Sequence, residues 1–330
     1  MQFGQLRRRE LITLLGGATA WLSAARAQQA ALPVIGFLNG GSAALLRRQV
    51  SAFHQGLQEA GYVEGANVAV DYRFAEGQFD RLQAMAEDLV RRQVSVITAS
   101  SMPAALAAKQ ATTTIPTVFS IGDDPAKLGL VTSFNRPSGN ATGIYEFQSG
   151  LEAKRLGLLH DLVPSATTVA VLVNPNYPAA EMSRLDAEEA AAKLSLKLII
   201  LTADVDSDFG DAFGKLVRER AAALLVTASA FFTSRRQYLV LLAMRHGVPA
   251  IYHWRDFAEA GGLMSYGTNL IDAYRQLGIY AGRILKGVKI IDLPVVQSTK
   301  FELLINLNAA KALGLDIPPM LLARADEVIE

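Results

Sequence analysis

The sequence predicts an α/β protein of two similar lobes, each a parallel β-sheet with helices on both faces. Short β-branched runs alternate with amphipathic helical stretches along nearly the whole chain. The order of these segments occurs twice, with closely matched spacing. A chain of 330 residues, 51% of them hydrophobic and 19% charged, is also long and apolar enough to bury two cores.

The first half reads as four strands joined by helices. Apolar residues spaced three and four apart predict a helix over 43–60, and Gly61 follows it as a C-cap glycine. Asp80 is expected to cap a second helix, and the alanine-rich residues 103–111 are expected to form a third. The expected strands are the β-branched runs 33–38, 67–74, 94–100 and 115–120.

The second half repeats this plan. A helix is expected over 179–193, and Asp208 is expected to cap the next helix. Three pairs of equivalent strands are offset by 135, 129 and 133 residues, a regularity that the general alternation of α/β proteins does not explain. The expected strands are 167–173, 196–202, 222–229 and 248–254. Ligands bind beyond the carboxyl ends of such parallel strands, so two facing lobes predict a shared cleft.

The C-terminal third is expected to return to the first lobe and then to cross back to the second. It contains a predicted helix over about 271–286, a strand over 299–307 and a short helix over 308–315. These crossings predict a multi-strand hinge. The expected lobes are residues 32–145 plus about 268–292 (lobe I) and residues 146–267 plus about 293–330 (lobe II).

The first 27 residues predict a cleaved signal peptide. Arginines at 7–9 precede a mildly apolar run over 11–25, and small residues stand two apart at 25–27. The run is shorter than the ~20 apolar residues that a membrane span needs. The arginines suit twin-arginine export, although Sec signals also carry arginines. The chain has no cysteine, so we expect neither disulfides nor a lipid anchor, and a soluble periplasmic product.

The composition and motifs argue against several classes of function. A net charge of +1 lacks the excess of basic residues that is typical of nucleic-acid-binding proteins. The sequence contains no dinucleotide fingerprint, no phosphate loop and no nucleophile elbow. Its four histidines lack metal-ligand spacing. We therefore expect no metal, no cofactor, no catalytic residue and no nucleic-acid partner. A catalytic acid/base pair formed by residues from distant loops is the alternative.

The loops after the predicted strands hold the candidate ligand-binding residues. Serines after the third strand precede Pro103 at a helix start, where backbone N–H groups favour an anion such as a carboxylate. Asp124, held extended by Pro125, could accept from a ligand ammonium. Capping of the local helix or turn is the alternative role for each of these residues. The candidates from the first lobe are Gly41, Ser42, Ser100, Ser101, Asp124 and Tyr145.

The second lobe offers a more aromatic set after its own strands. Aromatic side chains there could stack on a ligand ring, or equally pack within the lobe or the hinge. The candidates from this lobe are Asn174, Tyr177, Ser229, Phe231, Trp254 and Tyr266.

Four stretches carry a resemblance to a known family. They read AFHQGLQEAGYVEGANVAVDYRFAEG, PTVFSIGDDPAKLGLVTSFNRPSGNATG, GGLMSYG and FELLINLNAAKALGLDIPPMLLARADEVIE. They resemble the ABC-transporter substrate-binding proteins of the tryptophan-binding type, over about residues 32–330. The resemblance implies a type I periplasmic-binding fold, with two Rossmann-like lobes, a three-segment hinge and a small amino-acid-like, often aromatic ligand between them. It also implies that the serines hold a carboxylate and Asp124 an ammonium.

We expect a monomeric, non-catalytic periplasmic receptor that delivers its ligand to an ABC permease in the inner membrane. Many members of that family are lipoproteins, from which this cysteine-free chain departs. The alternative is a two-lobe cleft enzyme, a hydrolase or isomerase, for which Asp123 or Asp124 would supply the acid or base. A sugar-responsive repressor is disfavoured, because the chain has a signal peptide and lacks a DNA-binding head.

Overall fold

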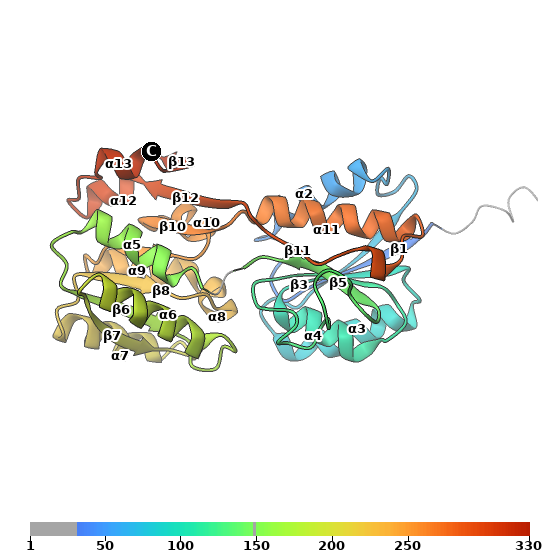
Figure 1. The fold of residues 1–330 in the computed structure, drawn as a ribbon, viewed down its shortest axis with the longest axis horizontal. Coiled ribbons are helices and arrows are strands. Elements are labelled where there is room, and N and C mark those ends of the chain that lie inside the picture. The colour runs from blue at the N-terminus through green and yellow to red at the C-terminus, as the bar shows by residue number, and fades with distance from the viewer. Residues whose placement is uncertain (1–31, 148–149) are drawn as a thin grey trace, which may run out of the picture.

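A computed structural model describes residues 32–147 and 150–330. Two α/β lobes of similar size lie side by side, joined by a narrow waist (Figure 1). The predicted signal peptide, residues 1–27, lies outside the described residues. Within the described part of the chain, no helix combines the length and the apolar character that a membrane crossing requires.

The first sheet has six parallel strands in the order β11-β5-β4-β3-β1-β2. Every residue of β3, β4 and β5 is buried, as expected for strands covered by helices on both faces. We call this sheet with its helices lobe I. Its strands are β1 (Val34–Asn39), β2 (Ala69–Phe74), β3 (Val96–Ser100), β4 (Thr117–Ile121), β5 (Ala141–Tyr145) and β11 (Val296–Gln297).

The second sheet has seven strands in the order β13-β12-β10-β9-β8-β6-β7. Among the strands described in this sheet, only β10 and β12 pair antiparallel. We call this sheet with its helices lobe II. Its strands are β6 (Thr168–Val173), β7 (Lys197–Thr202), β8 (Ala223–Val226), β9 (Ala250–Tyr252), β10 (Met264–Thr268), β12 (Phe301–Asn306) and β13 (Glu327–Ile329).

The repeated plan of the sequence is present in space. The order β4-β3-β1-β2 of the first sheet has its counterpart in the order β9-β8-β6-β7 of the second. The stretch VITAS (residues 96–100) forms β3, and the stretch LVTAS (residues 225–229) begins in β8 and ends in the loop that follows it. The strands β3 and β8 hold equivalent positions in the two sheets. The two halves are therefore built on one topology.

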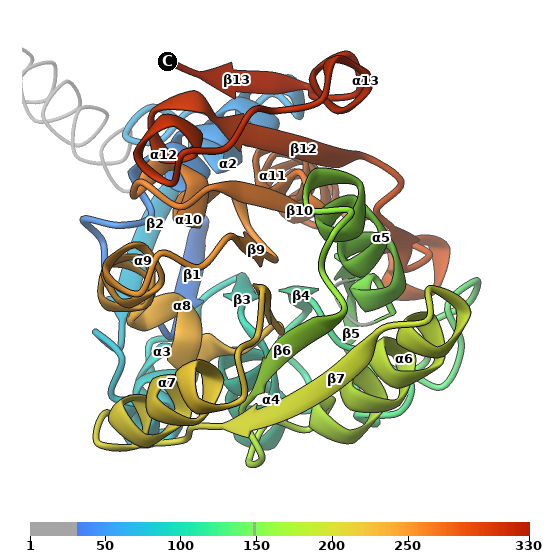
Figure 2. The ribbon, with the colours of Figure 1, turned by 90° about the vertical axis from the view of Figure 1, so that its left-hand side faces the viewer.

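Helices cover both faces of each sheet, with an apolar layer under each face. In lobe II, α5 and α6 lie on one side of the sheet and α7 and α9 on the other (Figure 2). Lobe I contains α2 (Arg47–Glu59), η1 (Phe79–Arg81), α3 (Leu82–Arg91), α4 (Met102–Ala111), α11 (Leu270–Leu285) and η2 (Ile290–Asp292). Lobe II contains α5 (Glu152–Leu162), α6 (Ala180–Lys193), α7 (Asp208–Arg218), α8 (Ala230–Ser234), α9 (Arg236–Arg245), α10 (Arg255–Glu259), α12 (Leu307–Ala312) and α13 (Pro319–Leu322).

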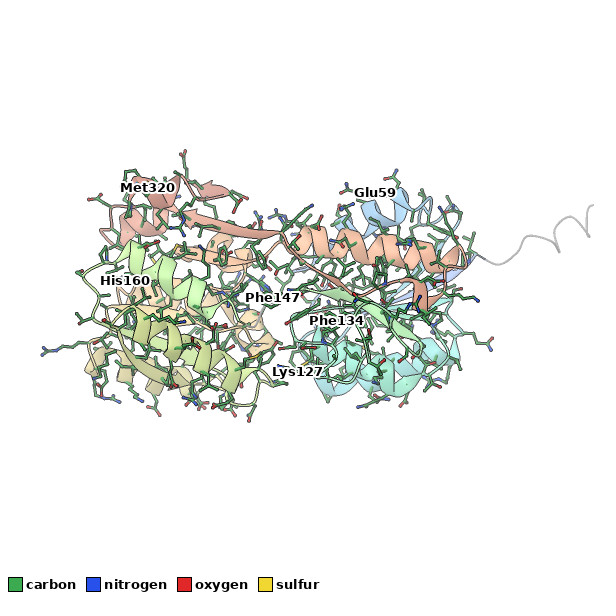
Figure 3. All side chains as sticks on the ribbon, viewed as in Figure 1. Glu59, Lys127, Phe134, Phe147, His160 and Met320 are labelled. Atoms are coloured by element: carbon green, nitrogen blue, oxygen red, sulfur yellow. The ribbon has the colours of Figure 1, made fainter. Side chains whose placement is uncertain are left out.

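The chain passes between the lobes three times, and the crossing segments bond to one another. The backbone N–H of Ser298 donates to the carbonyl oxygen of Tyr145 over 2.8 Å, and the Thr268 hydroxyl donates to the carbonyl oxygen of Glu146. Phe147 lies at the boundary between the lobes (Figure 3). Its ring contacts Tyr145 of lobe I at 5.7 Å and Phe301 of lobe II at 6.4 Å, measured between ring centroids.

The last crossing comes later than the expected return near residue 293. The two-residue strand β11 pairs with β5 in the first sheet, so the chain leaves lobe I only after Gln297. This strand is too short to show an alternating pattern, and Pro294 just before it obscures it further.

Two predicted helix caps are wrong. Asp80 lies inside the short helix η1, and α3 begins after Arg81 without a side-chain cap. The Asp208 carboxylate accepts from the backbone N–H groups of Asp204 and Val205, so it stabilises the turn before α7. Gly61 does end the α2 segment as predicted, with a φ of 84° that favours glycine.

Close backbone contact attaches α11, which comes from the C-terminal third, to α2 of lobe I. A Cβ atom added at Gly278 would stand 2.1 Å from the carbonyl oxygen of Phe53, and one added at Gly56 would stand 1.8 Å from that of Arg275. Neither contact can open by a side-chain rotation, because both involve backbone atoms. The glycines therefore let α11 cover the apolar face that contains Phe37 and Phe53.

We expect Gly278→Ala to destabilise the protein, because the two helices would have to separate to admit the methyl group. Such overpacking costs about 1–3 kcal/mol or more of the free energy of unfolding. Gly210→Ala is the matched control, since Gly210 is helical and has open space at its Cβ position. The control substitution should raise the free energy of unfolding by about 0.5–1 kcal/mol. Equal urea midpoints for the two variants would contradict the packing account.

Candidate functional site

A cavity of about 280 Å³ lies between the lobes. Residues that follow β1, β3, β4 and β5 line it from lobe I, and residues that follow β6, β8 and β9 line it from lobe II. Pockets for small ligands measure about 300–1,000 Å³, so this volume suits one small molecule. The parallel strands of both sheets thus end at one cleft.

Half of the predicted site residues line this cavity. The structure brings together Gly41, Ser42, Ser101, Tyr177, Ser229 and Trp254. The other predicted residues, Ser100, Asp124, Tyr145, Asn174, Phe231 and Tyr266, are not among those that line it.

Two of these residues make local contacts in lobe I. The Ser100 hydroxyl accepts a hydrogen bond from the amide of Asn39 over 2.7 Å. The Asp124 carboxylate accepts from the backbone N–H of Ala126 over 2.9 Å, so it stabilises a turn. Asp123, its neighbour, is the residue that faces the cleft.

The remaining four residues make contacts within their own lobes. Tyr145 packs against the ring of Phe134 in lobe I. In lobe II, Asn174 donates to the Ser229 hydroxyl over 3.2 Å, Phe231 stacks on Phe209 with ring centroids 5.5 Å apart, and Tyr266 stacks on Phe301 with ring centroids 6.1 Å apart.

Ser101 combines backbone strain with an unsatisfied hydroxyl. Its φ is 113°, a conformation that residues other than glycine rarely adopt and that costs about 1–3 kcal/mol. It precedes α4, yet its side chain caps no helical N–H. Among the described residues its buried hydroxyl oxygen has no hydrogen-bond partner. Strain and an unpaired polar atom at one position in a cleft wall are typical of a ligand contact.

Two buried carboxyl groups line one end of the cleft. Glu146 accepts a hydrogen bond from the Ser120 hydroxyl over 2.8 Å, and Asp123 accepts one from the Tyr177 hydroxyl over 2.7 Å. Burial raises the pKa of Glu146 to about 7, and the negative charge of Asp123 contributes to that rise. Burial also raises the pKa of Asp123, although the bond from Tyr177 opposes it. Both carboxylates would therefore gain from a nearby cation.

Sequence reasoning missed Glu146 as a site residue. It directly follows β5, and β5 ends at the same cleft as β3 and β4. A single glutamate at the start of a crossing segment has the appearance of a surface residue in the sequence, because Glu is rarely buried. Its position directly after a mostly apolar strand, ATGIY, was the available signal.

His253 and Trp254 form part of the wall that follows β9. Their ring centroids are 4.9 Å apart. Thr233 donates its hydroxyl proton to the carbonyl oxygen of Ser229 over 2.9 Å, so the His253 Nε2 atom, 3.1 Å from the Thr233 oxygen, must be the donor to it. Burial and the positive charge of Arg155 lower the pKa of His253 well below its usual value, so the ring is neutral.

Arg155 lies behind this wall in a buried polar network. Its Nε donates to the carbonyl oxygen of Tyr266 over 2.8 Å, and its Nη1 donates to Glu152 over 3.2 Å. Ser183 donates to the same carboxylate over 3.0 Å. Both charged side chains are fully buried, and burial of such a pair is tolerated only with partners of this kind.

Two contacts across the cleft show which strand ends face each other. The Tyr177–Asp123 bond sets the end of β6 opposite the end of β4. The ion pair between Arg48 of α2 and Glu259 of α10 sets the region after β1 opposite the region after β9. In each sheet one strand, β3 or β8, lies between these positions. Neighbouring strands are about 4.8 Å apart, so the ends of β4 and β1, which have β3 between them, lie about 10 Å apart.

Metal binding is not indicated in the described part of the chain. Residues 32–147 and 150–330 contain no cluster of three or more His, Cys, Asp or Glu side chains that could hold a metal ion.

Comparisons with known proteins agree on one family. Residues 33–329 match the sequence profile of a family described as ABC transporter substrate binding protein. The chain is 27% identical over 274 residues to a tyrosine-binding protein of Clostridioides difficile, covering 82% of this chain and 77% of that one.

Two solved structures are also similar. The structure of an ABC domain from Streptococcus pneumoniae in complex with L-Trp shares 24% identity at a TM-score of 0.82, covering 91% of this chain and all of that one. A ligand-free, open structure of a substrate-binding protein with adhesive properties from Clostridium difficile shares 25% identity at a TM-score of 0.70, covering 90% and 99% of the two chains.

We expect Glu146→Gln to change how stability depends on pH. The folded pKa of Glu146 lies above that of the unfolded chain, so the ionised form disfavours folding and stability is lost as the pH rises from about 4.5 to 7. A pKa difference of two to three units corresponds to ~3 kcal/mol by pH 8. The variant, which cannot ionise, should keep that stability while still accepting from Ser120.

The measurement is urea unfolding at pH 5 and pH 8. Glu87→Gln on the exposed face of α3 is the control for the loss of one surface charge. Identical pH dependence in the wild type and Glu146→Gln would show that Glu146 is not the buried, partly protonated group described above.

Proposed function

Since this chain belongs to the family of ABC transporter substrate-binding proteins, we propose that it binds an aromatic amino acid in the inter-lobe cleft and delivers it to an ABC permease. The observation that carries this proposal is a pair of buried carboxyl groups that line the cleft and accept hydrogen bonds from uncharged hydroxyl groups. Two carboxyl groups, Asp123 and Glu146, lie at one end, and the aromatic side chains Phe79 and Trp254 contribute to the walls.

The zwitterion of an amino acid fits this arrangement. Its ammonium would offset the buried negative charge of Asp123 and Glu146. Its carboxylate, attached to the same carbon as the ammonium, would accept from the unpaired hydroxyl of Ser101, which follows β3, the neighbour of β4. We therefore assign the ammonium to Asp123 and Glu146 rather than to Asp124.

The relatives support an aromatic side chain. One is named a tyrosine-binding protein and another was solved in complex with L-Trp. The apolar lining residues Leu45, Leu46, Phe79 and Leu270 suit such a ring.

We propose that the ligand stabilises a closed form of the two lobes. The contacts of Tyr177 with Asp123 and of Arg48 with Glu259 cross the cleft, and a ligand that touches both lobes binds their closed arrangement more tightly. The structural similarity is also greater to the L-Trp complex, with a TM-score of 0.82, than to the open, ligand-free relative, with a TM-score of 0.70. The closed form would dock on the permease, as a monomer in the periplasm after residues 1–27 are removed, without changing the ligand chemically.

We expect Asp123→Asn to weaken binding of aromatic amino acids strongly, whereas Asp124→Asn should bind like the wild type. The first substitution removes a charge from the cleft wall, and truncating one side of a buried charge pair costs about 2–5 kcal/mol, or roughly 30-fold to several thousand-fold in Kd. The second alters only a turn. The two variants carry the same loss of charge one residue apart.

The measurement is calorimetric titration with tyrosine, phenylalanine and tryptophan, with each ligand recovered afterwards to check that it is unchanged. Wild-type protein at a ligand concentration 100 times the Kd should also gain about 2.7 kcal/mol of stability. Equal losses in both variants would contradict the assignment of the ammonium. Absence of binding to all three amino acids would contradict the proposed ligand class, and turnover would favour the cleft enzyme.

A further inference from the structure

Ser229, in the lobe II wall of the cleft, has a hydroxyl oxygen whose two acceptor sites are already used. Its Oγ atom accepts from the side-chain amide of Asn174 and from the backbone N–H of Phe231, each over 3.2 Å. The Asn174 amide is fixed in this orientation, because its Oδ1 atom accepts from the backbone N–H of Asn176 over 2.9 Å. A serine hydroxyl has two acceptor sites and one proton, so only the proton of Ser229 is left to bond.

The remaining proton of Ser229 is directed towards the cavity. Ser229 is 3% exposed and lines the cavity, whereas neither Asn174 nor Phe231 lines it. Both bonds therefore reach the Oγ atom from the lobe side and leave the side of the cavity to the O–H bond. Within residues 32–147 and 150–330, this hydroxyl donates to no protein acceptor. Buried donors nearly always have an acceptor, so we expect a ligand to supply it.

The equivalent pair of residues in lobe I has the opposite orientation. The Asn39 amide donates to the Ser100 hydroxyl over 2.7 Å, as the Asn174 amide does to Ser229 in lobe II. In lobe I the asparagine lines the cavity and the serine does not, whereas in lobe II the serine lines it and the asparagine does not. The unpaired hydroxyl of Ser101 takes the place of Ser100 in the wall. Each lobe therefore contributes one serine with a proton to donate.

Ser101 and Ser229 lie at facing positions of the cleft. Ser101 follows β3, and Ser229 follows β8. The end of β4 faces the end of β6, and the region after β1 faces the region after β9. Since β3 lies between β4 and β1, and β8 between β6 and β9, the ends of β3 and β8 face each other. An acceptor between them receives a hydrogen bond from each lobe.

We infer that the carboxylate of the ligand bridges the two lobes, accepting from the Ser101 hydroxyl in lobe I and from the Ser229 hydroxyl in lobe II. A carboxylate has two oxygens and only accepts, so it suits two hydroxyl donors. The ammonium on the same ligand carbon then lies towards β4, where Asp123 lines the cavity. Asn174 is a positioning residue, because it acts on the ligand through Ser229. This inference rests on the proposed function, because it takes the ligand to be an amino acid.

The test is Ser229→Ala with a ligand whose carboxyl carbon can be observed. The probe is whichever of phenylalanine, tyrosine and tryptophan binds the wild type most tightly, uniformly labelled with ¹³C. Calorimetry gives its Kd, and nuclear magnetic resonance gives the bound shifts of its carboxyl and ring carbons. The control is Thr227→Val, which removes another buried hydroxyl from the same stretch, one that bonds to the carbonyl oxygen of Leu172 outside the cavity. Melting temperatures check that both variants are folded.

We expect Ser229→Ala to raise the Kd roughly tenfold to a hundredfold, the effect of losing one hydrogen bond to a charged group. The carboxyl resonance of the bound ligand should move more than its ring resonances, because the lost donor touches the carboxylate. Thr227→Val should keep both the Kd and the carboxyl resonance of the wild type.

Two results would overturn the inference and leave the proposed function standing. One is a carboxyl resonance that moves no more in Ser229→Ala than the ring resonances do, and the other is a Kd within about threefold of the wild-type value. Failure of all three amino acids to bind the wild type would overturn both the inference and the proposed function.

Discussion

Burial of two carboxyl groups at one point of the cleft is the constraint on which the rest of the site depends. Asp123 and Glu146 are bonded to the hydroxyls of Tyr177 and Ser120, which supply hydrogen bonds but no positive charge. Asp123 belongs to lobe I, Tyr177 to lobe II and Glu146 to the first crossing segment between them. A cation at this point therefore stabilises the two carboxylates and the contact between the lobes together.

The scaffold explains why these groups meet. Parallel strands in both sheets end at the same edge, so segments far apart in the chain deliver side chains to one cavity. The equivalent serines at the ends of VITAS and LVTAS show how one topology serves two purposes. The Ser100 hydroxyl bonds to Asn39 inside lobe I, and the strained Ser101 lines the cavity in its place. Ser229, in contrast, both caps α8 and lines the cavity.

Much of the fold could be predicted from the sequence, because alternation and spacing depend on burial along whole segments. The two lobes, the matched strand order and the family are confirmed. The predictions that differ from the structure concern single residues of the site. Whether Ser100 or Ser101, and Asp123 or Asp124, faces the cleft is decided by local backbone direction, which no periodic pattern reports. Glu146 depends on burial that arises only when the crossing segments assemble.

The most direct test of a cation bound against the buried carboxyl pair is the number of protons released on binding. Glu146 has a pKa of about 7, so at pH 7 about half of the molecules carry its proton before the ligand arrives. A ligand ammonium beside it lowers that pKa and expels the proton. Calorimetry of aromatic amino-acid binding at pH 7, in buffers with different ionisation enthalpies, should give roughly half a proton released per ligand. A binding enthalpy that is the same in every buffer would contradict the account.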